Sequence, residues 1–146
     1  MAKQFKLLKP ILYVAGIIEI AAGLLHFAMP EFAYRSKGFS LLQQGEIDFV
    51  TPVVFSVGIL LVAFGSLTTL FAMKIESTIL LLYYYLVIKT ALWTARIVLE
   101  LLYPVNLNMF NVEPFTTVVL PGLVFELLLF VISLTLARKI VRAKCV

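Results

Sequence analysis

Hydrophobic residues fall into four long runs along the chain, and charged or turn-forming residues separate the runs. A helix needs about 20 apolar residues to cross roughly 30 Å of hydrocarbon, and each run reaches that length. The pattern therefore predicts an all-α integral membrane protein, an up-down four-helix bundle forming a single membrane domain over residues 1–146. The expected helices cover residues 10–29, 52–73, 79–102 and 115–138.

Prolines and hydroxyl residues mark the expected helix ends. Thr51 supplies an N-cap oxygen, and Pro52 after it has no amide hydrogen to leave unpaired. Ser77 and Thr78 offer caps for the third helix. Pro121 falls inside the fourth run, where it removes a backbone hydrogen bond, so we expect a kink there.

The two connections around the second and third runs differ in length. The segment "KIES" at residues 74–77 is so short that it predicts antiparallel packing of the helices over residues 52–73 and 79–102. The segment over residues 30–50 mixes aromatic and charged residues. We expect it to form a short interfacial helix or lid on the outer membrane surface.

Composition excludes a soluble globule and orients the chain. Hydrophobic residues make up 62% of the sequence and charged residues 14%, with a net charge of +4. The basic residues gather before the first run, between the second and third runs, and after the fourth run. By the positive-inside rule, this distribution places both termini in the cytoplasm. We expect the protein to lie in the plasma membrane. The basic residues therefore indicate orientation rather than nucleic-acid binding. The group comprises Lys3, Lys6, Lys9, Lys74, Arg138, Lys139, Arg142 and Lys144.

Charged residues also occur inside the third run. At about 100° per residue, Lys89, Arg96 and Glu100 share one narrow helix face with Tyr85 and Trp93. An ionised group at the centre of a span costs about 2.5 to 3.5 kcal/mol on insertion scales. We therefore expect this face to turn inward, with Tyr85 and Trp93 available for cation-π contacts.

The first run carries a second polar stripe. Gly16, Glu19, Gly23 and His26 lie on one face, where small residues flank a carboxylate and an imidazole. Such a stripe predicts a helix-packing surface. Gly58 and Gly65 in the second run likewise favour close helix approach, although that run carries no charge. The buried polar groups then form two expected levels, Glu19, Lys89 and Glu126 at the midplane, and His26, Arg96 and Glu100 above it.

This polar core has two interpretations. It is either a salt-bridge network that fixes helix register, or a site for a ligand or ion. Three acids against two fixed cations leave one negative charge in excess, so either one carboxylate is protonated or His26 is charged. With one histidine and one cysteine, Cys145, the sequence predicts no metal site.

The sequence shows no nucleophile paired with a base and no phosphate-binding glycine loop, so we predict a non-catalytic protein. An acid-base enzyme acting on a lipid, with Glu19 or Glu126 as proton carrier, stays open.

The stretch "AGIIEIAAGLLHFAMPEF", followed by "VGILLVAFGSLTTLFA", resembles the start of the DoxX-like group of small four-helix membrane proteins, and "RIVLELLYPV" adds to the likeness. The resemblance implies a four-span fold. Because some members are linked to quinone-coupled oxidation complexes, it also implies a membrane redox context. It assigns no catalytic residue.

Together these features predict a small accessory subunit, non-catalytic or binding a lipophilic ligand such as a quinone. Its partners would be the lipid bilayer and other membrane subunits or a second copy. The alternative is a small proton or ion conductor that uses the midplane glutamates and lysine. The uncharged second run and the lack of an inverted repeat argue against it.

Overall fold

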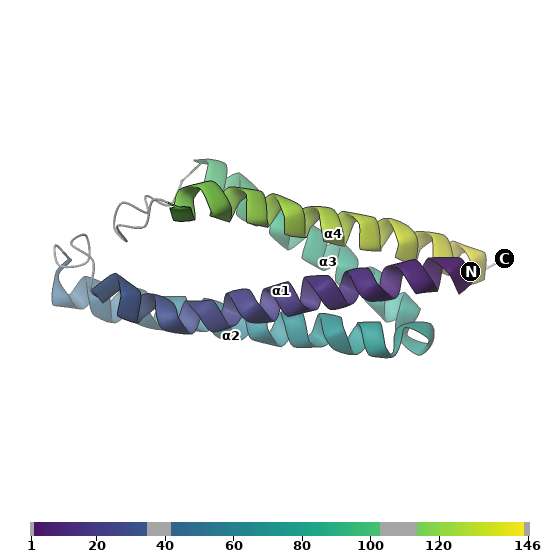
Figure 1. The fold of residues 1–146 in the computed structure, drawn as a ribbon, viewed down its shortest axis with the longest axis horizontal. Helices are drawn as coiled ribbons and strands as arrows, with labels where there is room; N and C mark the ends of the chain where they lie inside the picture. Colours follow the sequence, from purple (N-terminus) through teal and green to yellow (C-terminus); the bar gives the residue numbers. More distant parts are fainter. Residues whose placement is uncertain (1, 35–41, 103–113, 145–146) are drawn as a thin grey trace.

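The computed structural model describes residues 2–34, 42–102 and 114–144, with side chains at 3–30, 42–102 and 119–144. Within these residues the protein is all-helical (Figure 1). Each helix is long and apolar enough to cross a membrane, which confirms the predicted fold class at that level. The helices are α1 (Ala2–Tyr34), α2 (Gln44–Met73), α3 (Ile75–Leu102) and α4 (Pro114–Lys144).

The helix α2 begins earlier than its apolar run. The backbone N–H of Gln43 donates to Glu46 Oε2 at 2.8 Å, which secures the first turn. The expected cap at Thr51 and Pro52 is therefore wrong, because Thr51 Oγ1 lies inside the helix and donates to the Ile47 carbonyl at 2.8 Å. Residues 44–50 thus continue α2 and form no separate interfacial helix. The rest of the expected outer lid, residues 35–41, lies outside the described residues.

The helix α3 also begins early, at Ile75, directly after Lys74. Ser77 and Thr78 do not act as N-caps, since their hydroxyls donate to the Lys74 carbonyl at 3.0 and 2.8 Å from within the first turn. Pro121 lies within α4, and the kink expected there stays a prediction.

Glycines bring α1 and α2 into backbone contact. A β-carbon added to Gly65 would lie 2.6 Å from the Gly16 carbonyl oxygen, and one added to Gly23 would lie 2.7 Å from that of Gly58. Only a residue without a side chain fits such spacing. The earlier glycine of α1 faces the later glycine of α2, so the two helices run antiparallel (Figure 1). This confirms the close approach expected of these glycines.

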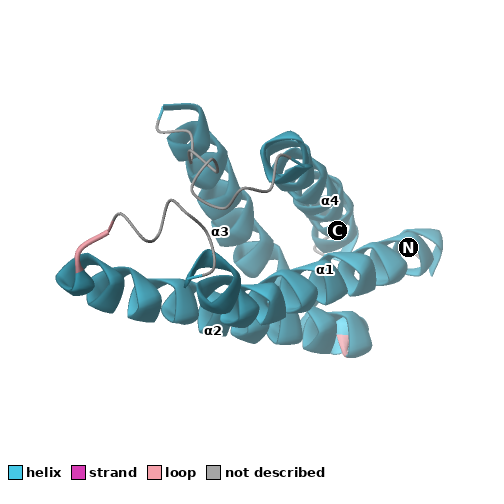
Figure 2. Cartoon of the chain, turned by 60° about the vertical axis from the view of Figure 1, so that its left-hand side comes forward, coloured by secondary structure: helices cyan, strands magenta, loops and turns pink. Residues whose placement is uncertain are grey.

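The expected pairing of α2 with α3 is wrong. The helix α2 contacts α1 far more extensively than it contacts α3, and α3 packs mainly against α4. Figure 2 shows the resulting two pairs, α1 with α2 and α3 with α4. A short connection fixes only the ends of two helices, whereas the glycine face of α2 complements α1 along its length. The complementary packing surfaces of α1 and α2 therefore determine which helix α2 packs against.

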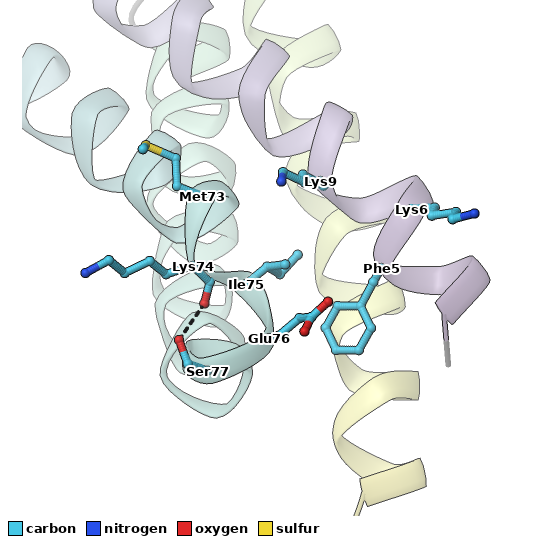
Figure 3. Close-up of a pocket in the computed structure, with 8 residues that line it drawn as sticks. All are labelled: Phe5, Lys6, Lys9, Met73, Lys74, Ile75, Glu76 and Ser77. Atoms are coloured by element: carbon cyan, nitrogen blue, oxygen red, sulfur yellow. Dashed lines mark hydrogen bonds between the residues drawn. The ribbon is translucent and has the colours of Figure 1, made fainter.

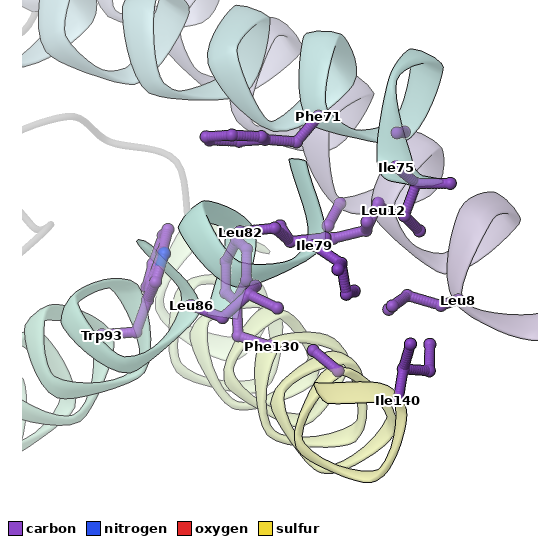
Figure 4. Close-up of a cluster of buried hydrophobic side chains, with 13 residues drawn as sticks. Leu8, Leu12, Phe71, Ile75, Ile79, Leu82, Leu86, Trp93, Phe130 and Ile140 are labelled. Carbon is purple, nitrogen blue, oxygen red and sulfur yellow. The ribbon is translucent and has the colours of Figure 1, made fainter. Parts of the chain in front are cut away.

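One end of the bundle is closed by apolar side chains. Lys144 Nζ donates to the Glu76 carbonyl at 3.1 Å, so the last turn of α4 meets the first turn of α3. The start of α1 lies at the same end (Figure 1). The buried side chains between them point toward one another (Figure 4). They include Leu8, Leu12, Ile75, Ile79, Leu82 and Ile140.

Candidate functional site

The centre of the bundle holds a buried ion pair between α1 and α3. Lys89 Nζ contacts Glu19 Oε1, and the two side chains are 4% and 0% exposed. The polar faces predicted for these two helices therefore do meet inside the bundle at this level. Because neither group reaches solvent, each depends on the other for its charge to be tolerated.

Glu19 receives further hydrogen bonds from two other side chains. Trp93 Nε1–H donates to Glu19 Oε1 at 3.4 Å, and Thr68 Oγ1 lies 3.2 Å from Glu19 Oε2, where it can donate. Each carboxylate oxygen thus has at least one donor, as a buried carboxylate requires. Since Thr68 belongs to α2, the single side chain of Glu19 ties together α1, α2 and α3.

Aromatic rings surround the Lys89 ammonium. Its Nζ lies 4.6 Å from the ring centroid of Phe64, 5.1 Å from that of Phe130 and 5.8 Å from that of Trp93. Trp93 and Phe130 stack on each other with centroids 6.3 Å apart. The cation-π contact expected of Trp93 is present, and the electron-rich ring faces stabilise the cation where water is excluded.

A hydroxyl network extends the site toward α2. Tyr85 OH and Thr68 Oγ1 lie 2.7 Å apart, and both approach the Phe64 carbonyl oxygen, at 3.0 and 2.9 Å. Each hydroxyl has one proton, so Tyr85 can donate to Thr68 while Thr68 donates to Glu19. The expected stacking of Tyr85 on a cation is not among the described contacts, and its ring packs against Phe71 instead, with centroids 5.1 Å apart.

Glu126 of α4 lies beside this pair but is not part of it. Its residue is 4% exposed, and it is close enough to interact electrostatically with both Glu19 and Lys89. Among the described residues, its Oε1 has no hydrogen-bond partner. Because Lys89 pairs with Glu19, no cation within the described part of the chain forms an ion pair with Glu126. A proton, a water molecule or a ligand must satisfy it.

The expected outer level of His26, Arg96 and Glu100 forms only in part, because Arg96 and Glu100 pair but His26 does not join them. Arg96 Nη1 pairs with Glu100 Oε2 at 2.6 Å, one turn along the same helix, with side chains 45% and 10% exposed. His26 Nδ1 lies 2.7 Å from the Ala22 carbonyl oxygen, and its β-carbon faces Gly58. The close packing of α1 on α2 thus places His26 beside α2.

Three members of the site, Thr68, Phe64 and Phe130, were not predicted from the sequence. A signal for Thr68 was available, because small residues recur on one face of α2, at Gly58, Gly65, Thr68 and Ala72, and all four are buried. That stripe places the threonine on the surface facing α1. The two phenylalanines had no comparable signal among so many apolar residues.

The described residues include no group of three His, Cys, Asp or Glu side chains that could hold a metal ion. Searches of protein-family models, curated proteins and solved structures found no match to this chain. The chemistry of the site therefore rests on its own geometry, which combines a satisfied ion pair in an aromatic cage with an unsatisfied carboxyl group beside it.

Proposed function

We propose that the protein is an up-down membrane bundle with both termini in the cytoplasm, and that it acts as a non-catalytic accessory subunit of a larger membrane redox complex. In this role it binds a lipophilic ligand such as a quinone. The observation that carries the proposal is the buried Oε1 atom of Glu126, which has no hydrogen-bond partner among the described residues and lies beside the Glu19–Lys89 ion pair. Such a group is available to a visiting hydrogen-bond partner.

Quinones match the chemistry of Glu126. When protonated, its carboxyl group can donate to a quinone carbonyl, and when ionised it can accept from a quinol hydroxyl. Trp93 and Phe130 are buried and stack on each other beside the ion pair, so the surroundings of the site are apolar and aromatic, as a quinone ring prefers. The resemblance to DoxX-like proteins, which the comparisons do not test, points in the same direction.

The uneven distribution of polar groups supports binding rather than conduction. The buried charges lie at the level of Glu19 and Lys89, and Arg96 and Glu100 continue toward the end of α3. The opposite half is filled by the apolar cluster around Leu8 and other aliphatic side chains (Figure 4). A proton path across the membrane would need polar groups or water through that half as well.

The test is purification from native membranes in a mild detergent, followed by mass spectrometry of the proteins and lipids retained. We expect partner subunits and a quinone to copurify, and we expect Glu126→Leu to reduce quinone retention while Glu46→Gln, an exposed control, does not. A free monomer that retains neither quinone nor partner would overturn the proposal.

One observation favours the alternative of a proton conductor. Ser133 Oγ is also buried without a hydrogen-bond partner among the described residues, two turns from Glu126 on the same side of α4. Two such groups could support a water chain. Proton flux into liposomes that disappears with Glu126→Gln would establish this function, and flux equal to that of empty vesicles would exclude it.

Orientation has an independent test in Cys145, the one cysteine of the chain. In intact cells a membrane-impermeant maleimide should leave it unlabelled, and labelling should appear once the membrane is opened. Labelling of intact cells would reverse the proposed topology.

A further inference from the structure

A hollow of about 460 Å³ lies at the end of the bundle where α1 begins and α2 turns into α3 (Figure 3). Its volume falls within the range of small-molecule sites. Side chains from the first turns of α1 face the α2–α3 connection across it. The lining residues are Phe5, Lys6, Lys9, Met73, Lys74, Ile75, Glu76 and Ser77.

The hollow carries uncompensated positive charge. Lys6, Lys9 and Lys74 line it, and within the described part of the chain none of them forms an ion pair. Lys9 extends across the hollow toward α2, whereas Lys6 and Lys74 lie on its two flanks with their ammonium groups pointing outward (Figure 3). Glu76 is the one acid in the lining, so cations outnumber it.

We propose that this hollow binds the phosphate headgroup of an anionic membrane lipid. It lies where four membrane-length helices end, which is the depth of lipid headgroups. Exposed apolar side chains continue from it along α2, with Met73 at 59% and Leu70 at 53% exposure. A headgroup held by the lysines would therefore direct its acyl chain onto an apolar surface. Basic pockets at the cytoplasmic ends of membrane helices bind such lipids.

The far wall of the hollow is held in place by α4. Lys144 Nζ lies 5.7 Å from the ring centroid of Phe5 and donates to the Glu76 carbonyl. A fourth cation thus bridges two lining residues. This contact joins the start of α1 to the first turn of α3, so the hollow is defined by packed elements.

The experiment is native mass spectrometry of the full chain in mild detergent, titrated with phosphatidylglycerol or phosphatidylcholine. We expect selective binding of phosphatidylglycerol. The triple variant Lys6→Gln, Lys9→Gln, Lys74→Gln should weaken it roughly 100-fold, given what each basic residue contributes near an anionic surface. The matched control Lys3→Gln, Lys139→Gln, Arg142→Gln removes the same charge from exposed positions outside the lining and should weaken binding less than about threefold.

Removing the negative charge from the lining gives a second test, with an expected effect opposite to that of removing the lysines. Glu76→Gln should raise phosphatidylglycerol affinity roughly fivefold, whereas Asp48→Asn at the other end should leave it unchanged. The proposal is overturned if both triple variants lose binding equally, if phosphatidylcholine binds as well, or if millimolar inorganic phosphate displaces the lipid. Because no quinone or partner protein is present, the outcome is independent of the proposed function.

Discussion

Replacing Lys89 with methionine isolates the contribution of the buried ion pair. Methionine fills much of the same volume but leaves Glu19, which is 0% exposed, without its counter-charge. Breaking a buried pair from one side costs about 3 to 5 kcal/mol. We expect about 3 kcal/mol here, at the lower end, because Thr68 and Trp93 still donate to the carboxylate and a proton can neutralise it.

The assay is reversible unfolding in mixed micelles of a mild detergent and dodecyl sulfate, followed by circular dichroism. The control is Arg96→Met, which breaks a pair whose arginine is 45% exposed and should cost less than about 1 kcal/mol. The double variant Glu19→Met, Lys89→Met removes both charges and should return to within about 1 kcal/mol of the parent protein. Equal losses of unfolding free energy in Lys89→Met and Arg96→Met would refute the claim that burial makes the Glu19–Lys89 pair the costlier one to break.

Three further predictions use the same unfolding assay. Gly65→Ala should destabilise the protein by about 1 to 3 kcal/mol, since the added methyl group would meet the backbone of α1. Gly122→Ala is the control and should be neutral or stabilising, because no atom lies near its added methyl group. A larger loss for Gly122→Ala than for Gly65→Ala would contradict the glycine contact. Glu126→Leu should leave stability unchanged or raise it by up to about 2 kcal/mol, because the buried Oε1 atom has no hydrogen-bond partner among the described residues; a loss above about 1 kcal/mol would contradict this reading. Thr68→Val should cost about 1 kcal/mol, and combining it with Tyr85→Phe should cost less than the sum; strict additivity would argue against a shared network.

Hydrophobic run length predicted the four helices because the bilayer sets that length directly. It did not predict their ends, since a helix continues past its apolar run as long as local hydrogen bonds permit, as at Gln43 and Glu46. The partner of α2 was also predicted wrongly. Loop length constrains only where two helices meet, and the complementary glycines of α1 and α2 determine which surfaces pack.

The energetic cost of burying a charge predicted ion pairing correctly where burial is complete. Glu19 and Lys89, both buried in the middle of long apolar helices, had no alternative to pairing. It failed for the expected approach of His26 to Arg96, two residues that lie nearer the helix ends. There a long side chain can pair along its own helix, and an imidazole can bond to its own backbone. The angular position of a residue on its own helix also does not predict which neighbouring helix packs against that face.

The most direct test of the central claim, a paired Glu19 and Lys89 inside the bundle, is a distance measurement in lipid bilayers. Solid-state NMR dipolar recoupling between the Lys89 side-chain nitrogen and the Glu19 carboxyl carbon, with Lys89→Arg to assign the signal, measures it. The account predicts a separation of about 4 Å or less, as in a contact ion pair. A separation beyond roughly 6 Å would exceed any direct ion-pair contact and would contradict it.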